Sequence, residues 1–218
     1  MSVPDLGERC RAIYTAAIAD VLDRRGLTSQ TLPPELLPLQ EGMRLAGLAY
    51  PVKGRPAPNS DYETSLRRVL EMLGSVPAKH VLVYETGDRA TAHLGELSVT
   101  ALKARGVEGA VIDGGCRDVE FILRENFPVF CRHTTPQDST GRWALVGHGD
   151  VEIEIGGVRV AHADFVVADR DGIVVIPAAF VEPVVSEAEE KATTESEIRV
   201  AVRDGTSPLE AYDNFGTF

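Results

Sequence analysis

The fold is decided by residues 81–131, which read VLVYETGDRATAHLGELSVTALKARGVEGAVIDGGCRDVEFILRENFPVFC. Apolar runs suited to buried strands alternate in this stretch with helical patterns. These strands and helices are expected, in chain order, at 81–84, 95–105, 110–112, 118–125 and 128–131. A β-α-β-α-β order predicts parallel strands that are joined by right-handed crossovers and buried on both faces. We therefore expect an α/β fold with a parallel unit at its centre.

The segment before this unit predicts two helices and a strand. From about residue 10 to about residue 25, apolar residues recur at helical spacing, and Gly26 follows as a C-terminal cap. A strand is expected at 43–52 and a second helix at 61–73.

The segment after the unit predicts an antiparallel hairpin and a long helix. Residues 151–155 alternate strictly, Gly156-Gly157 supplies a two-residue turn, and 158–160 return. A further strand pair is expected at 164–168 and 172–176, and a long charged helix runs from about 178 to 204.

Composition and charge exclude several classes of protein. The 218 residues are 44% apolar and 25% charged, which is typical of a folded globular chain. The formal charge of −11 disfavours nucleic acid and anionic membranes as partners. No run approaches the ~18 apolar residues of a membrane span, and residues 1–8 show no export signal, so we expect a cytoplasmic protein. Cys10, Cys116 and Cys131 share no CxxC spacing and are expected to be reduced thiols.

Polar residues follow two neighbouring strands of the parallel unit. Gly95 and Glu96 start one predicted helix, and Arg117 and Asp118 start the next. In a parallel sheet, both turns lie at the carboxyl edge, where helix N-termini receive anions. The pattern has a structural alternative, because an Arg-Asp pair often only caps a helix and acids are common in first helical turns. His93, just before the helix, is compatible with either a substrate contact or a packing role.

Two motifs resemble a known family. They are Gly95-Glu96-Leu97 and GVEGAVIDGGCRD at 106–118, in which an acid, twenty intervening residues and an Arg-Asp pair follow each other. They resemble the class II pyruvate aldolases that act on 4-hydroxy-4-methyl-2-oxoglutarate and 4-carboxy-4-hydroxy-2-oxoadipate, whose superfamily includes the regulator of ribonuclease activity A. The resemblance covers nearly the whole chain. It implies one domain over 1–218, built as a layered α/β/β/α sandwich.

The resemblance also implies a role for each site residue. Asp118 would contact Mg²⁺ or Mn²⁺ directly, and Glu96 would hold metal-bound water. Arg117 would bind the keto or enolate oxygen, and the backbone N–H groups from Gly95 to Leu97 would receive the substrate carboxylate. Pocket walls that set specificity are expected in loops such as 54–61 and 131–142.

The family takes a further acid from the C-terminal helix of a neighbouring subunit. Glu195 is the best match, but the same helix carries other acids that compete with it: Glu187, Glu189, Glu190 and Glu197. A site completed in this way requires an oligomer, and the family implies a homotrimer or a hexamer.

The implied function is a divalent-metal-dependent carbon–carbon lyase. It would cleave a 4-hydroxy-2-oxo diacid to pyruvate and a second oxo acid, with oxaloacetate decarboxylation as a side activity. The alternative is a non-catalytic, protein-binding regulator of the ribonuclease-regulator type. Aldolase members often have Asp where this chain has Glu96, whereas the regulator branch lacks the first and last acids of the pattern. The presence of both acids favours the lyase.

Overall fold

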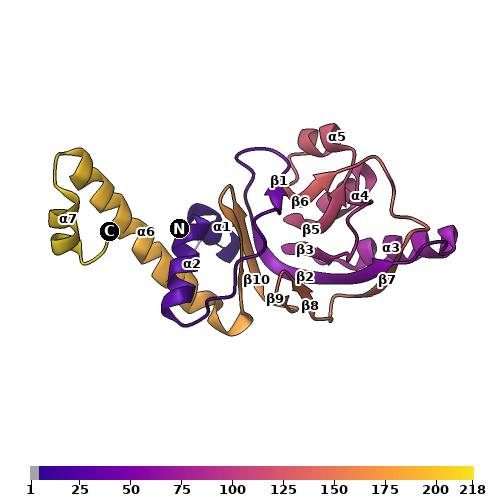
Figure 1. Ribbon diagram of the computed structural model, residues 1–218, viewed down its shortest axis with the longest axis horizontal. Coiled ribbons are helices and arrows are strands. Elements are labelled where there is room, and N and C mark those ends of the chain that lie inside the picture. The colour runs from indigo at the N-terminus through magenta and orange to yellow at the C-terminus, as the bar shows by residue number, and fades with distance from the viewer. Residues whose placement is uncertain (1–4) are drawn as a thin grey trace.

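The computed structural model describes residues 5–218, and a nine-stranded mixed sheet and a two-stranded sheet lie at its centre (Figure 1). The strands are β1 (Leu37–Pro38), β2 (Leu45–Pro56), β3 (His80–Glu85), β4 (Ala92–Leu94), β5 (Gly109–Cys116), β6 (Val129–Thr134), β7 (Trp143–His148), β8 (Ile153–Ile155), β9 (Val158–Val160), β10 (Phe165–Asp169) and β11 (Gly172–Ile176). The helices are α1 (Leu6–Ala12), α2 (Thr15–Arg24), α3 (Tyr62–Ser75), α4 (Glu96–Ala104), α5 (Val119–Arg124), α6 (Val181–Arg203) and α7 (Pro208–Phe215), and a 3₁₀ turn (Ala178–Phe180) precedes α6.

The predicted parallel unit is present. Strands β3, β5 and β6 pair in parallel, and helices α4 and α5 connect them. Strand β2 extends this sheet, pairing in parallel with β3 and antiparallel with β10 and β7. The predicted hairpin is formed by β8 and β9, and β10 pairs with β11 as expected.

Three buried apolar clusters separate the layers. One lies between the sheet and α3, α4 and α5, and includes Met72, Leu102 and Ile112. The second lies inside the curved sheet, and the third packs α1, α2 and α6 against β10 and β11. Figure 1 shows the two groups of helices on opposite sides of the sheet. The expected α/β/β/α layering is therefore confirmed.

The sheet is nearly closed by the segment between α2 and β2. Thr31 bridges Val174 of β11, while β1 pairs antiparallel with β6 at the other edge of the strand order. This segment therefore pairs with part of each outer strand, which leaves fewer free backbone groups that could pair with other chains.

The predicted helix at about 10–25 is wrong in its extent, because two helices occupy this region. The chain is extended at Ile13 and Tyr14, and α2 begins at Thr15. The Asp169 carboxylate accepts hydrogen bonds from the Thr15 N–H (2.9 Å) and from its hydroxyl (2.6 Å). A distant residue therefore caps α2, which explains why local spacing did not reveal the break.

Two strands are longer than predicted. Strand β2 continues to Pro56 because β7 pairs with its second half. Strand β5 continues through Asp113 to Cys116, a stretch expected to be loop, because β4 and β6 pair with it there. The Arg117-Asp118 pair consequently follows the strand directly.

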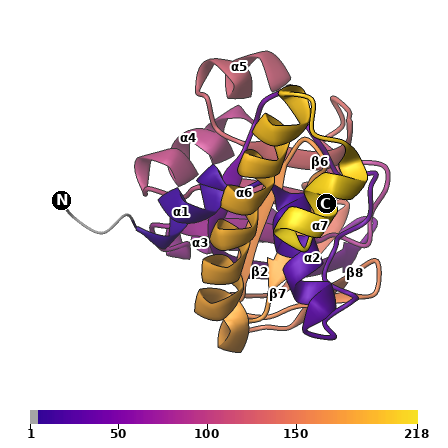
Figure 2. The same ribbon diagram turned by 90° about the vertical axis from the view of Figure 1, so that its left-hand side faces the viewer.

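The C-terminal helix forms as predicted, with α6 spanning Val181–Arg203. It lies against α2, as Figure 2 shows, and leads to the additional helix α7. Figure 1 places α7 at the end of the molecule opposite α3, α4 and α5. Within residues 5–218, no helix is both long and apolar enough to cross a membrane.

Candidate active site

The starts of helices α4 and α5 lie side by side. Strand β4, which leads into α4, pairs in parallel with the end of β5, and the Arg117 N–H donates to the Leu94 carbonyl at 2.9 Å. Glu96, Arg117 and Asp118 are thus brought to one edge of the sheet. The Glu96 N–H donates to Asp118 Oδ2 at 3.1 Å, which joins the two helix starts directly.

Gly95 makes this approach possible. A Cβ atom at residue 95 would lie 2.5 Å from Asp118 Oδ2 and 3.2 Å from Arg117 Cγ and Nε. The backbone at Gly95 is extended, with φ −144°, so the requirement is for space rather than for a special dihedral angle. A larger residue would displace one of the two charged side chains.

The N-terminus of α4 presents free backbone donors to the same place. Gly95 is the N-cap and offers no side-chain acceptor. The Glu96 N–H is used by Asp118, and within residues 5–218 the next two, from Leu97 and Ser98, make no hydrogen bond. Free N–H groups and the positive end of the helix dipole favour a carboxylate at such a position. The Leu97 side chain is 81% exposed and turns away from the core.

Asp118 has a left-handed backbone, with φ 58° and ψ 35°, at the N-cap of α5. This conformation is uncommon for a residue other than glycine and is frequent at functional positions. Its side chain does not cap its own helix and reaches α4 instead. The structure thus gives the Arg-Asp pair a different geometry from that of an ordinary helix cap.

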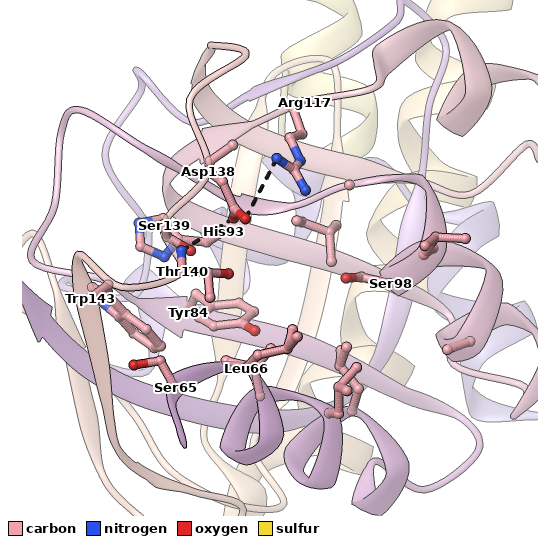
Figure 3. A pocket seen from close by; sticks show the side chains of 18 of the residues that line it. Ser65, Leu66, Tyr84, His93, Ser98, Arg117, Asp138, Ser139, Thr140 and Trp143 are labelled. Carbon is pink, nitrogen blue, oxygen red and sulfur yellow. Dashed lines mark hydrogen bonds and ion pairs between the residues drawn. The ribbon is translucent and has the colours of Figure 1, made fainter. Parts of the chain in front are cut away.

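Arg117 lies between two carboxylates. Its Nε is 3.7 Å from Asp118 Oδ2. Its Nη1 is 3.8 Å from Asp138 Oδ2, and Figure 3 shows this pair. These distances exceed those of close hydrogen-bonded ion pairs, so the guanidinium keeps donors available. Asp138 was not singled out by sequence reasoning, although it lies in the loop 131–142 that was expected to form a pocket wall. A single acidic residue in a loop forms no sequence pattern that would mark it as part of a site.

His93 is buried next to this site. Its Nε2 donates to Asp88 Oδ2 at 3.2 Å, and its ring packs edge-on against Trp143 at 5.0 Å between centroids. Burial lowers the pKa of His93 to about 4, although Asp88 acts in the opposite direction. In the described part of the chain, its Nδ1 has no hydrogen-bond partner. His93 is therefore a neutral, packed histidine with one unused acceptor.

A cavity of about 340 Å³ extends from Arg117 between α3 and α4 (Figure 3). Its volume is within the range of small-molecule sites. Leu97 and Ser98 line it from α4, and Asp138 and Trp143 line it from the opposite loop and β7. The first turn of α4 is thus open to a chamber of ligand size.

The donor set suits a hydrated hard cation. Asp118 Oδ1 and the Glu96 carboxylate make no hydrogen bond or ion pair with any residue of 5–218, and the missing Cβ of Gly95 keeps the space beside Asp118 open. Within the described range, no three His, Cys, Asp or Glu side chains cluster around a possible metal position. Mg²⁺ does not require such a cage, because one or two carboxylates and several waters suffice. The residues present therefore fit Mg²⁺ or Mn²⁺.

Glu195 does not join these residues in its own chain. Its Oε2 accepts a hydrogen bond from the Tyr14 hydroxyl, and its Oε1 pairs with Lys191 Nζ at 2.7 Å. It lies on α6, across the sheet from α4 and α5 (Figure 1). Glu195 could therefore contribute only to the site of another subunit.

The cysteines do not contribute nucleophiles. Cys10, Cys116 and Cys131 are free and buried. Burial raises the pKa of the Cys116 thiol, although this residue is adjacent to Arg117, and raises the pKa of Cys131 to about 11. Thiols in this state are unreactive near neutral pH.

Comparisons with known proteins identify relatives over most of the chain. Residues 15–175 match the RraA-like family, described as Aldolase/RraA. The chain is 32% identical over 204 residues to a protein of Halalkalibacterium halodurans named "Putative 4-hydroxy-4-methyl-2-oxoglutarate aldolase", covering 93% of this chain and 90% of that protein.

Solved structures share the fold. Streptomyces coelicolor RraAS2, described as an unusual member of the RNase ES inhibitor RraA protein family, superposes with a TM-score of 0.79 and 30% identity, over 91% of this chain and 99% of that one. An uncharacterized protein from Pseudomonas syringae pv. tomato superposes with a TM-score of 0.82 and 28% identity, over 94% and 96% of the two chains.

Proposed function

This chain belongs to the RraA-like (Aldolase/RraA) family, and on that premise we propose that it is a divalent-metal-dependent lyase that cleaves a 4-hydroxy-2-oxo acid to pyruvate and a second oxo compound. The observation that carries the proposal is the contact at Gly95, which brings Asp118, Arg117 and the free N–H groups of α4 around one point. Relatives named as aldolases support the reaction class.

The substrate's carboxylate would bind at the start of α4. The N–H groups of Leu97 and Ser98 are oriented by the helix and need no reorganisation to receive it. Arg117 would donate to the 2-oxo oxygen, on which negative charge develops. Asp118 and Asp138 flank the guanidinium at 3.7 and 3.8 Å, and its donors remain available to this oxygen.

Asp118 would hold Mg²⁺ or Mn²⁺ directly, and Glu96 would hold it through a bound water molecule. A bound cation of this kind supplies positive charge that polarises the 2-oxo group. Arg117 shares that task from the protein side. Its hydrogen bonds strengthen as the oxygen gains charge, which lowers the barrier rather than merely increasing ground-state binding.

The bond changes are those of a retro-aldol cleavage. The bond between C3 and C4 breaks, and its electron pair forms the enolate whose charge rests on the C2 oxygen. The C4 hydroxyl loses its proton and becomes a carbonyl group. The unpaired Glu96 carboxylate would take that proton through a water molecule, and C3 is then protonated to give pyruvate.

Oxaloacetate decarboxylation requires only part of this machinery. Loss of CO₂ leaves the same pyruvate enolate, but no hydroxyl has to be deprotonated. Arg117 and the α4 N-terminus would serve both reactions, whereas Glu96 would matter mainly for the cleavage of hydroxy acids. Comparing Glu96→Gln on the two substrates separates these roles.

We also propose that Glu195 acts in a neighbouring subunit of a homotrimer or hexamer, as the family resemblance implies. Because Tyr14 and Lys191 hold both of its oxygens, it would be a fixed rather than a mobile acid. Glu195→Gln should lower turnover, whereas Glu197→Gln on the exposed face of the same helix should not. Equal activity of both variants would remove Glu195 from the mechanism.

The direct experiment measures pyruvate release from oxaloacetate and from 4-hydroxy-2-oxoglutarate, with Mg²⁺ and after EDTA treatment. We expect release with Mg²⁺, its loss with EDTA, and its return when Mg²⁺ or Mn²⁺ is added back. Release that is unaffected by EDTA would contradict the metal-dependent mechanism.

A non-catalytic regulator is the second candidate, since the chain superposes on RraAS2 over nearly the whole length of both proteins. This function predicts no pyruvate release from any oxo acid and no dependence on Arg117. The same assay therefore separates the two candidates.

A further inference from the structure

The cavity beyond Arg117 differs in character from the site at its mouth. Its far wall is formed by apolar side chains from two helices and from β7: Leu66, Val69 and Leu73 of α3, Ala101 of α4, and Trp143. Figure 3 shows Leu66 and Trp143 on the side of the chamber opposite Arg117. A substrate held by its carboxylate at α4 would extend its C4 substituent toward this wall.

The charged residues that residues 5–218 of one chain contribute to the cavity do not provide a second site for a carboxylate. Among its lining residues, the cations are Arg117 and Arg105. Arg117 is assigned to the 2-oxo oxygen. Arg105 follows the end of α4, ten residues beyond Gly95, and at 1.5 Å per residue it lies about 15 Å along the helix. Its Nε already donates to the Val76 carbonyl at 3.0 Å. A five-carbon diacid held at Gly95 is too short to reach it.

The acidic residue that lines the cavity disfavours the binding of a second carboxylate. Asp138 lines the chamber next to Arg117, and its Oδ1 already accepts from the Thr140 N–H at 3.2 Å. A substrate carboxylate placed beyond Arg117 would face this like charge and would lose water without gaining a cation. An alkyl or aryl group would instead displace water from apolar surface, which is favourable.

We propose that the cavity selects substrates whose leaving half is uncharged and apolar, so that the second product is an aliphatic or aromatic aldehyde or ketone. This inference rests on the proposed function and narrows its substrate class, replacing the diacid expected from the family resemblance. The bond changes are those already given, with the C4 oxygen becoming the carbonyl of the apolar product.

The test compares three substrates in the presence of Mg²⁺. Pyruvate release is measured from 4-hydroxy-2-oxo-4-phenylbutanoate, from 4-hydroxy-2-oxoglutarate and from oxaloacetate. Oxaloacetate is the reference, because it loses CO₂ rather than an aldehyde or ketone. We expect kcat/KM for the phenyl substrate to exceed that for the diacid by about tenfold or more, the scale that apolar pocket contacts support. An equal or higher value for the diacid would overturn the inference.

A variant that adds a cation to the wall sharpens the test. Leu66→Arg should raise diacid cleavage relative to phenyl-substrate cleavage, and Ser65→Lys provides a second variant if the first does not fold. Thr64→Arg places the same charge on the exposed side of α3, outside the cavity lining, and should leave the ratio unchanged. A ratio that does not move in a folded cavity variant would overturn the inference.

The failures of the two proposals are distinguishable. Decarboxylation of oxaloacetate without cleavage of the phenyl substrate refutes the apolar leaving half but keeps the enolate chemistry. Absence of pyruvate from all three substrates refutes both proposals.

Discussion

The two ends of the molecule treat charge differently. At the helical end, charged side chains that lie between α1, α2 and α6 are paired: Arg9 donates to Glu182 and Glu189, and Lys191 pairs with Asp20 and Glu195. At the start of α4, the Glu96 carboxylate has no partner within residues 5–218, and Arg117 is more than 3.5 Å from both nearby acids. Satisfied charges hold helices together, whereas charges left available are suited to a ligand.

Among the substitutions that test this comparison, replacement of Arg117 should have the largest effect on activity. Loss of one preorganised donor to a developing oxyanion typically costs 10²–10³-fold in turnover, or about 2.7–4 kcal/mol in barrier. We expect Arg117→Ala to reduce pyruvate release from oxaloacetate by this factor at unchanged thermal stability. Arg124→Ala, which removes an exposed arginine of α5, serves as the control. Full activity of folded Arg117→Ala would contradict the role.

His93 predicts a pH dependence of stability. Burial lowers its pKa to about 4, compared with about 6.5 in the unfolded chain, so the unfolded state binds the proton first as the pH falls. The associated stability is complete above pH 6.5 and is lost as the pH falls to about 4, by on the order of 3 kcal/mol. Asp88, whose pKa is lowered from 3.8, loses its contribution only below this window.

Urea unfolding at pH 7 and pH 4.5 measures this effect. His93→Gln should show a smaller loss of stability between the two pH values than the wild type. His80→Gln, at a half-buried position, should follow the wild type. Parallel losses in all three proteins would show that His93 does not titrate as described.

Alanine substitutions at Gly95 and Gly47 should have different effects at the two ends of the molecule. Gly95→Ala places a Cβ 2.5 Å from Asp118 Oδ2, and displacement of a catalytic group by about 1 Å can cost about 10²-fold in rate. Gly47→Ala places one 2.8 Å from the Lys79 carbonyl, away from the site. We expect the first variant to lose activity and the second to lose stability, as measured by specific activity and thermal melting. The reverse pattern would contradict the assignment of the site.

The smallest effect is expected at Arg9. Its network with Glu182 and Glu189 is partly exposed, so Arg9→Met should cost about 1 kcal/mol or less. For a chain of this size, that corresponds to a fall of about 2–4 °C in Tm, with specific activity unchanged. Arg67→Met, which removes a largely exposed pair with Glu63, should have no measurable effect. A loss of specific activity in Arg9→Met would show that the helical end does more than stabilise.

Local periodicity was sufficient to predict the parallel unit and the 151–160 hairpin, because these elements bury regular apolar faces. It missed β4 because the three residues Ala92–Leu94 are too few to show an alternating pattern. It missed β7 because Trp143–His148 becomes a strand only by pairing with β2. The break before Thr15 depends on Asp169, which is distant in sequence.

The sequence predicted that Glu96, Arg117 and Asp118 converge at one edge of the sheet and that loop 131–142 lines the cavity, but it did not predict the apolar wall from α3. The turn after each parallel strand placed Glu96 and Arg117-Asp118 at one edge, which general topology requires. The left-handed backbone of Asp118, the position of Asp138 beside Arg117 and the apolar wall from α3 all depend on packing between distant segments. No local pattern carries that information.

The most direct test of the central claim is the Mg²⁺ dependence of oxaloacetate decarboxylation by the wild type and by Asp118→Asn. The wild type should release pyruvate in proportion to bound Mg²⁺, and the Asn variant, which loses the charge but keeps the shape, should show little release even at high Mg²⁺. Equal activity of the two proteins, or activity of the wild type without any divalent cation, would contradict the account.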